Sequence, residues 1–139
     1  RDFIASHRDV RVEMPIRGGC HTELSDEVVA AYEAPFPDVD YKAGIRTFHP
    51  MIPVTPDSPG AAAGQAAAKY LMQDDRPSLV LWADQDPALP LDPVGRTVQM
   101  LFPKAEPLTV IEGAGHFLQE DHGEEIGRII ADWLGRNPL

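Results

Sequence analysis

The sequence contains a single cysteine, Cys20, in 139 residues. One thiol cannot form an internal disulfide, and a metal centre built from several cysteines is excluded. Basic residues are also scarce, because 12 Lys and Arg stand against 22 Asp and Glu, a formal net charge of −10. We therefore expect no nucleic-acid partner, which would need a basic patch, and no binding to an anionic membrane. Apolar runs of about 20 residues, the length of a membrane span, are missing too.

The sequence does contain enough apolar side chains for a folded core, with 43% hydrophobic and 24% charged residues. Its length corresponds to about one domain. The opening stretch RDFIASHRDV lacks the charged region and the following apolar region of a signal peptide. Together with the free thiol, this predicts a cytoplasmic protein.

Cap residues and apolar spacing predict four helices and two short buried strands. Ser25 is a candidate N-cap flanked by Leu24 and Val29, and Asp92 and Asp121 are candidate caps further along. The expected helices cover 26–34, 61–72, 93–102 and 121–134, and the expected strands cover 78–83 and 108–111. Residues 1–22 and 47–60 are expected to be irregular, apart from a short helix near the start.

The alternation of helices and strands in the second half predicts an α/β fold with a parallel sheet. The last helix carries an apolar stripe that is wider than two strands can cover. Its members are Ile126, Ile129, Ile130, Trp133 and Leu134.

Two candidate catalytic residues follow the two strands. Asp86 comes after the strand SLVLWA, and His116 comes after LTVI in the loop EGAGHFLQED. Because the carboxyl ends of parallel strands lie at one edge of a sheet, the two side chains could meet. A carboxylate can hold a histidine in one tautomer and stabilise its charged form, which makes His116 a candidate base and Asp86 its partner. Asp84 competes with Asp86 for that place, and a lone histidine here would be read as an ordinary turn residue.

The motifs SLVLWADQDPALP and LTVIEGAGHFLQED resemble the last two strand–loop units of the α/β-hydrolase fold. The stretch LSDEVVAAYEAPFPDVDYKAGIRTFHPMIP resembles the cap domain of haloalkane dehalogenases and its return to the sheet. The resemblance implies the C-terminal part of such a fold with a partial helical cap. Residues 1–50 would be the partial cap and return segment, and residues 51–139 the C-terminal part of the core.

The resemblance also implies a reaction. In that family a carboxylate nucleophile displaces halide and forms an alkyl ester, which water activated by the histidine then hydrolyses. Carried over, His116 is the base and Asp86 the acid, and neither a cofactor nor a metal is needed. The substrate would be a small apolar, halogenated molecule that reacts with water. The implied pocket wall consists of Phe36, Pro37, Leu89, Phe117 and Leu118.

Two departures from the family pattern limit this reading. The strand–turn–helix elbow that carries the nucleophile is not found, so the chain looks like a C-terminal half whose partner would be the missing N-terminal half. Ser6 in Phe3-Ile4-Ala5-Ser6 stands where the family has a halide-binding tryptophan. Loss of that indole donor would weaken halide stabilisation.

Two other readings remain open at this point. An epoxide or ester hydrolase would keep the fold and the Asp–His pair, and Tyr32 and Tyr41 are the available cap tyrosines for epoxide opening. A truncated, non-catalytic interaction module would keep the fold and lose the chemistry. Substitution of His116 distinguishes an enzyme half from such a module.

Overall fold

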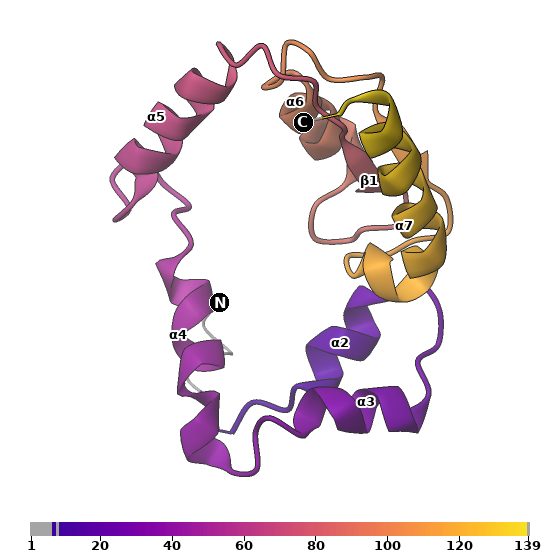
Figure 1. The fold of residues 1–139 in the computed structure, drawn as a ribbon. Coiled ribbons are helices and arrows are strands. Elements are labelled where there is room, and N and C mark those ends of the chain that lie inside the picture. The colour runs from indigo at the N-terminus through magenta and orange to yellow at the C-terminus, as the bar shows by residue number, and fades with distance from the viewer. Residues whose placement is uncertain (1–6, 8, 139) are drawn as a thin grey trace. The chain divides into compact units, whose positions relative to one another are not determined.

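The computed structural model describes residue 7 and residues 9–138 of the chain. The described residues form two compact units: 7 and 9–17 with 24–67, and 18–23 with 68–138. Figure 1 labels most of the elements. The expected helix near the start and the Ser6 position both lie outside the described residues.

The first unit is helical. It contains α3 (Asp26–Glu33), the 3₁₀ turn η1 (Val39–Lys42) and α4 (Ala43–Met51), while α2 (Glu13–Gly19) and α5 (Ala61–Leu71) have residues in both units. The second unit contains β1 (Leu81–Ala83), the turn η2 (Leu91–Gly95), α6 (Arg96–Gln99), β2 (Thr109–Ile111) and α7 (Leu118–Arg136).

β1 and β2 form a parallel pair, as the sequence predicted. Leu81 lies opposite Thr109 and Ala83 opposite Ile111. Both strands are shorter than predicted, and Ser78 joins the pairing only through a separate bridge to Ala105. The α/β class with a parallel crossover is therefore confirmed.

A small core ties this sheet to α7. Ala83, Ile111 and Ala114 are buried, and Ile126 and Ile129 of α7 pack against them. Of the other members of the α7 stripe, Trp133 is half-buried, whereas Ile130 is 40% and Leu134 45% exposed. The stripe is thus wider than this sheet covers, as its spacing predicted.

The start of α3 also follows the prediction. Ser25 accepts a hydrogen bond from the Val28 N–H with its hydroxyl oxygen (3.3 Å). Leu24 and Val29, which flank this cap, are both buried. Side-chain capping and burial of the flanking apolar residues together fix where the helix begins.

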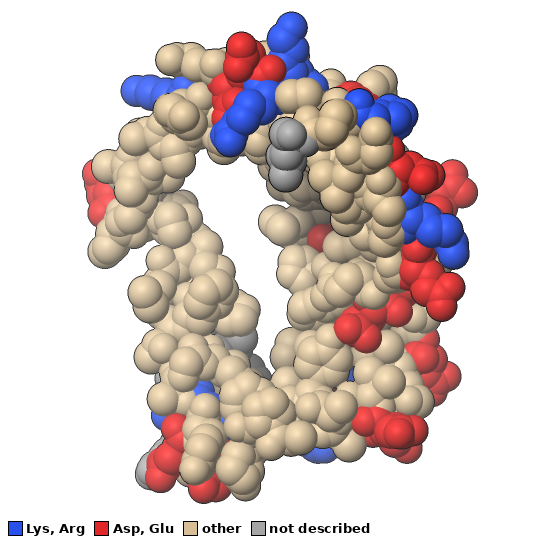
Figure 2. Space-filling view, in the orientation of Figure 1, with Lys and Arg blue, Asp and Glu red and all other residues tan. Residues whose placement is uncertain are grey.

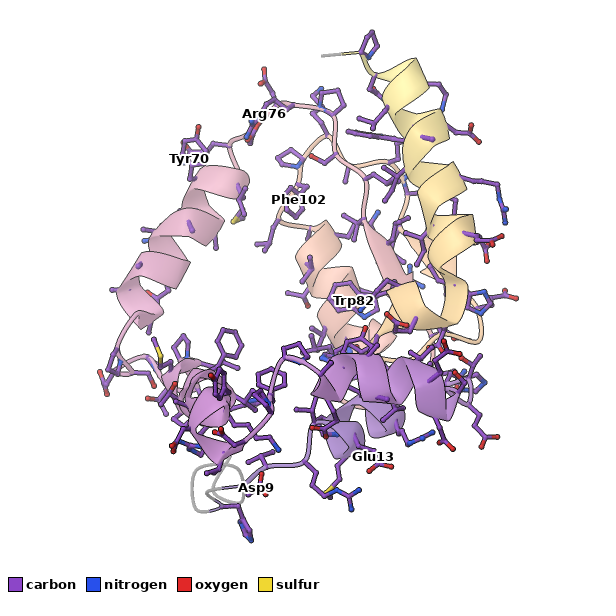
Figure 3. All side chains as sticks on the ribbon, turned by 60° about the horizontal axis from the view of Figure 1, so that its bottom comes forward. Asp9, Glu13, Tyr70, Arg76, Trp82 and Phe102 are labelled. Carbon is purple, nitrogen blue, oxygen red and sulfur yellow. The ribbon has the colours of Figure 1, made fainter. Side chains whose placement is uncertain are left out.

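A buried lysine joins several segments of the first unit. Lys42 is 7% exposed, and its ammonium group lies 2.8 Å from Asp9 and 3.8 Å from Glu33. Glu33 also accepts a hydrogen bond from the Glu13 N–H (3.0 Å). Figure 3 marks Asp9 and Glu13 in this network. A buried charge needs such partners, because an unpaired ammonium group would lose its hydration without compensation.

The prediction that residues 1–22 are irregular was wrong for α2. Val12 and Ile16 lie one turn apart and are both buried, and the Ile16 N–H donates to the Val12 carbonyl (3.3 Å). Arg17 also pairs with Glu13 one turn back (3.3 Å). Tertiary burial of this short apolar face outweighs the two glycines at its end.

The prediction of a loop over residues 47–60 was wrong at its start, where residues 47–51 belong to α4. Pro50 lies in the last turn of that helix. A proline there removes one backbone donor without interrupting the earlier turns. The Thr47 hydroxyl donates to the Ala43 carbonyl (2.9 Å), which satisfies an acceptor of the first turn.

Two predicted helix caps were also wrong. Asp92 makes no capping hydrogen bond and instead lies 3.5 Å from Arg96. α7 begins earlier than predicted, at Leu118, and has a non-helical residue at His122 (φ −137°, ψ 37°). The Asp121 carboxylate accepts hydrogen bonds from residues outside α7. Long-range partners outweighed the local capping pattern in this case.

Charged side chains are distributed unevenly among the helices. Acidic side chains gather over α7, where Glu124, Glu125 and Asp132 are exposed (Figure 2). The surface over α5 is mostly uncharged in the same view. Among the described residues, no helix is long and apolar enough to cross a membrane.

Candidate active site

His116 and Asp86 lie on the exit loops of the two paired strands. His116 Nδ1 is 2.9 Å from Asp86 Oδ2. The parallel register explains this meeting, because Ala83 and Ile111 bring both strand ends to the same edge of the sheet. The structure thus brings together the two residues that the sequence predicted as a pair.

The Asp86 carboxylate is held on both oxygens. Its side chain is 8% exposed, and Oδ1 accepts hydrogen bonds from the Ala88 N–H (2.8 Å) and the Leu89 N–H (2.9 Å). Burial by itself would raise the pKa of this carboxyl. The hydrogen bonds from Leu89, His116 and Ala88 outweigh burial and lower the pKa below its usual value. Asp86 is therefore ionised at neutral pH and fixed in orientation.

This geometry sets the tautomer of His116. An ionised carboxylate only accepts hydrogen bonds, so Nδ1 of a neutral His116 carries the proton and Nε2 carries the lone pair. The side chain is 37% exposed, and Nε2 has no hydrogen bond to any of the described residues. The ring packs edge-on against Phe117, with centroids 5.2 Å apart. His116 is therefore arranged to take a proton at Nε2.

Asp84, the other candidate acid, has a different set of partners. Its Oδ1 accepts hydrogen bonds from the Gly113 N–H (2.8 Å) and the Ala114 N–H (3.3 Å), and its Oδ2 accepts from the Gln85 amide. It thus binds the backbone before His116 and not the imidazole. Sequence spacing alone could not separate the two aspartates, because both follow the same strand.

Asp121 is a polar residue of this region that the sequence analysis assigned only to a helix start. The structure puts its carboxylate against the Gly115 N–H, next to His116 in the chain (2.8 Å). Its partners His21 and Thr22 lie about a hundred positions away in the sequence. No local pattern signals such a contact.

The five predicted pocket residues divide between the two units. Phe36 and Pro37 lie in the first unit, after α3, with Phe36 half-buried and Pro37 exposed. Leu89, Phe117 and Leu118 lie in the second unit. Leu118 packs against the core of the sheet, Phe117 contacts the His116 ring, and Leu89 is 43% exposed.

Leu89 also has a backbone role. Its carbonyl accepts a hydrogen bond from Trp82 Nε1 (2.9 Å). The Trp82 ring fills the place that a side chain at Gly95 would need, since an added Cβ there would lie 2.8 Å from the ring. Trp82 therefore ties the end of the Asp86 loop to η2.

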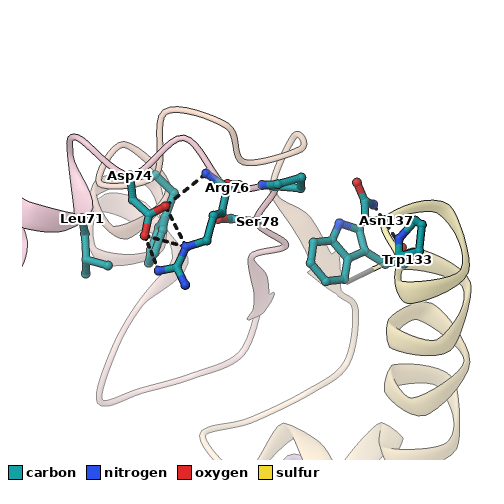
Figure 4. A pocket seen from close by; sticks show the side chains of 9 residues that line it. Leu71, Asp74, Arg76, Ser78, Trp133 and Asn137 are labelled. Atoms are coloured by element: carbon teal, nitrogen blue, oxygen red, sulfur yellow. Dashed lines mark hydrogen bonds and ion pairs between the residues drawn. The ribbon is translucent and has the colours of Figure 1, made fainter.

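A cavity of about 470 Å³ lies elsewhere in the second unit (Figure 4). Its lining includes Ser78 before β1, Phe102 after α6 and Trp133 near the end of α7. Arg76 and Asp74 pair at its rim through two-pronged hydrogen bonds. Because Ser78 precedes β1 whereas Asp86 follows it, this cavity belongs to the amino end of the sheet and is not the predicted substrate pocket.

The described part of the chain contains no cluster of three His, Cys, Asp or Glu residues placed to hold a metal ion. The polar groups around His116 are instead bonded to one another and to backbone amides.

Comparison with known proteins places this geometry in a family. The sequence pattern of a family described as the alpha/beta hydrolase fold matches residues 42–123. The chain belongs to the α/β-hydrolase family. The matched range contains Asp86 and His116 together with both strands.

Within the α/β hydrolases the chain is similar to haloalkane dehalogenases. It is 38% identical over 125 residues to the enzyme of Psychrobacter cryohalolentis, and 37% identical over 123 residues to that of Mycobacterium marinum. The alignments cover 88% and 85% of this chain but only 41% and 39% of those proteins. The chain thus spans about two fifths of the length of these relatives.

A solved structure agrees with this assignment. The haloalkane dehalogenase DbeA from Bradyrhizobium elkani superposes with a TM-score of 0.77 at 26% identity, covering 89% of this chain and 42% of that one. The predicted fold class and the predicted resemblance to haloalkane dehalogenases are therefore confirmed.

Proposed function

We propose that this chain is the C-terminal portion of a haloalkane dehalogenase, to which it contributes His116 as the base and Asp86 as the acid. The observation that carries the proposal is the 2.9 Å contact between His116 Nδ1 and Asp86 Oδ2 at the carboxyl ends of paired strands. Similarity to dehalogenases over most of the chain supports it. The nucleophile would come from protein outside these 139 residues.

The reaction would proceed in two steps. An external carboxylate attacks the halogen-bearing carbon, so that a carbon–oxygen bond forms and halide leaves with the bonding electrons. His116 Nε2 then takes a proton from water as that water attacks the ester carbonyl. Breakdown of the resulting intermediate releases the alcohol, whose oxygen takes the proton back from His116. The carboxylic acid that remains then loses its proton to solvent, which restores the carboxylate, so the net products are the alcohol, halide and one proton.

Asp86 would act through His116 and not on the substrate. Its negative charge stabilises the imidazolium that forms when Nε2 takes the proton. Its two amide partners, Ala88 and Leu89, keep the carboxylate from rotating away. Because both charges are held in place beforehand, little reorganisation is needed during the step.

The proposed substrates are small, apolar halogenated alkanes. The proposed location of the enzyme is the cytoplasm. Phe36, Pro37, Leu89, Phe117 and Leu118 are the proposed apolar wall, and Phe117 contacts the base directly. An apolar wall favours uncharged substrates. Ser6 in place of the family's halide-binding tryptophan would weaken halide stabilisation, so halide release is the readout that tests this part of the proposal.

A chimera tests this function directly. The chain would be fused behind the N-terminal part of the Psychrobacter cryohalolentis dehalogenase that it does not match. We expect halide release from a brominated alkane by the chimera and none from the 139-residue chain alone. Cleavage of an epoxide or a nitrophenyl ester without halide release would instead support the related hydrolases.

Variants of the chimera assign the two roles. His116→Gln should release about one halide per enzyme and then stop, because alkylation precedes the step that needs the base. Mass spectrometry should detect the trapped alkyl group. Asp86→Asn should lower turnover by roughly 10⁴-fold, since it removes the charge that orients and stabilises the imidazole.

His122→Gln serves as the matched control for the histidine variant, because the His122 ring pairs with Glu125 (3.3 Å) and not with Asp86. Full turnover by His116→Gln would refute the assignment of the base. Loss of turnover in His122→Gln to the same extent would show that any change in this region is damaging.

A further inference from the structure

The loop that carries His116, residues 112–117, has its backbone donors directed at fixed acceptors. We call it the histidine loop. The Gly113 and Ala114 N–H groups donate to Asp84 Oδ1, and the Gly115 N–H donates to Asp121 Oδ2 (2.8 Å). Three successive amides just before His116 are therefore held by two carboxylates.

Asp84 and Asp121 reach the histidine loop from different parts of the chain. Asp84 directly follows β1 and Asp121 lies in α7. The Gln85 N–H also donates to the Ala114 carbonyl (3.0 Å), which ties the loop to the segment that carries Asp86. The path from β2 to His116 is thus fixed to the element that carries its partner.

The Asp121 carboxylate has four donors. They are the His21 N–H (3.0 Å), the Thr22 N–H (2.8 Å), the Thr22 hydroxyl (2.5 Å) and the Gly115 N–H (2.8 Å). Two oxygens offer about four lone-pair sites, so the acceptor capacity of this group is filled. Such a carboxylate is fixed in orientation, and the Gly115 amide is fixed with it.

A second set of contacts brings the 19–22 segment against the histidine loop. The Phe117 N–H donates to the Gly19 carbonyl (3.0 Å). An added Cβ at Gly115 would lie 2.4 Å from the Gly19 carbonyl oxygen, and one at Gly19 would lie 2.4 Å from the Phe117 ring. The backbone of the 19–22 segment therefore packs directly against the backbone of the histidine loop. The Asp121 carboxylate accepts hydrogen bonds from amides of both segments.

We propose that Asp121 is a positioning residue for His116, which clamps the histidine loop to the 19–22 segment while Asp84 holds the same loop from the β1 side. Asp121 touches neither the imidazole nor the substrate. It acts by fixing the Gly115 peptide, from which the His116 side chain is aimed at Asp86. The importance of this role for catalysis rests on the proposed function. The effect of Asp121 on the position of His116 does not depend on it.

NMR of the His116 ring nitrogens in the 139-residue chain tests the clamp. When the imidazole is neutral, the nitrogen shifts report which ring nitrogen carries the proton. We expect the Nδ1–H form to dominate in the unaltered chain. Asp121→Ala should lower its fraction by about half or more, because His116 then loses its fixed approach to Asp86. Asp86→Ala, which removes both the charge and the acceptor, provides the reference signal of an unpaired His116.

Two further variants grade the effect. Asp121→Asn keeps one oxygen acceptor and should lie between the unaltered chain and Asp121→Ala. Thr22→Val removes only the hydroxyl donor to Asp121 and should give a smaller change of the same sign. If Asp121→Ala does not fold, these two variants still decide the question. Asp132→Ala, an exposed aspartate on the same helix, is the matched control and should leave the tautomer unchanged.

The proposal is overturned if the Asp121 variants unfold more easily but keep the Nδ1–H fraction of the unaltered chain. That result would leave Asp121 as a purely structural residue. An equal loss in Asp132→Ala would overturn it as well. The readout does not involve halide, so an inactive chimera with a responsive tautomer would refute the dehalogenase proposal and leave the clamp standing.

Discussion

The two ends of the small parallel sheet differ sharply in how their polar groups are satisfied. At the carboxyl end, Asp84, Asp86 and Asp121 accept hydrogen bonds from loop amides, and His116 completes the network. At the amino end lies the cavity of about 470 Å³, where the buried Trp133 Nε1 has no hydrogen-bond partner among the described residues. Glycine-rich exit loops offer free amides to carboxylates at the carboxyl end, whereas at the amino end the Asp74 carboxylate pairs with the exposed Arg76 side chain.

This difference teaches that the strands themselves do not determine where a site forms. The same three paired positions in each strand lead to both ends. The carboxyl end is organised because the exit loops carry acidic side chains next to unpaired backbone N–H groups, and charged hydrogen bonds of this kind are among the strong ones. The predictions below act on the shared core, then on one end at a time.

The largest effect should come from the core that both ends share. Ile111 has no exposed surface, and Ile111→Ala should lower the free energy of unfolding by about 2–5 kcal/mol. Urea denaturation of the chain measures this loss. Ile111→Val is the matched control and should cost about 0.5–1.5 kcal/mol. Equal stabilities of the two variants would mean that the sheet does not depend on this packing.

Gly115→Ala should damage the carboxyl end alone. The added methyl group would lie 2.4 Å from the Gly19 carbonyl oxygen, and the neighbouring atoms are backbone that cannot rotate away. We expect a loss of about 1–3 kcal/mol in urea denaturation, together with a changed His116 tautomer. Gly127→Ala in α7 meets no atom within 4 Å and should instead stabilise the helix by up to ~1 kcal/mol. A neutral Gly115→Ala would contradict the close packing of the histidine loop.

Lowering the pH should affect the unfolding free energy differently at the two ends of the sheet, because their carboxylates have different partners. Burial opposes ionisation of Asp121, but hydrogen bonds from His21, Thr22 and Gly115 outweigh it and lower the pKa to about 2. A lowered folded-state pKa gives stability that is present above the unfolded value of ~3.9 and is lost as the pH falls toward ~2. Asp121→Asn should therefore flatten the decline in unfolding free energy between these limits.

Asp74 at the amino end is the comparison for that experiment. Its hydrogen bonds with Arg76 also lower its pKa to about 2. The Arg76 side chain is 75% exposed, so added salt should screen this pair strongly. Asp74→Asn should flatten the acid decline less than Asp121→Asn, and at high salt it should have little effect. A larger effect of Asp74→Asn would contradict the prediction that the Asp121 hydrogen bonds contribute more stability than the Asp74–Arg76 pair.

The smallest effect should come from Trp133→Phe. The substitution removes a buried indole N–H that has no partner among the described residues and keeps an aromatic ring at the cavity. Because no hydrogen bond is lost, the unfolding free energy should change by only about 0.5 kcal/mol in either direction. A loss well above that value would show that Nε1 is satisfied in solution.

Helix caps and short apolar runs, which involve only neighbouring residues, correctly predicted several elements. Ser25 begins α3 because its hydroxyl meets the Val28 amide, and that contact spans one helical turn. The two strands were visible as short apolar runs, and the crossover between them made a parallel pair the natural arrangement. The meeting of Asp86 and His116 followed from that topology, without any side-chain detail.

The predictions that failed have other causes. α2 forms because Val12 and Ile16 find a place to be buried, although two glycines close the same segment. Asp92 pairs with Arg96 instead of capping a helix. The energy that formed α2 came from tertiary packing, which a local window does not contain and which outweighs intrinsic propensity. Asp92 differs, because Arg96 lies only four residues away and the local sequence offered both the cap and the ion pair.

The sequence by itself determined the α/β alternation, the resemblance to haloalkane dehalogenases and the identity of the histidine that follows β2. Only the tertiary structure separated Asp86, which meets His116, from Asp84, which binds the histidine loop. It also brought Asp121 against Thr22 and Gly115. The reason is physical: strand order and hydrophobic periodicity are written in short stretches of chain, whereas the choice among neighbouring carboxylates depends on which amide donors the folded loops bring within about 3 Å.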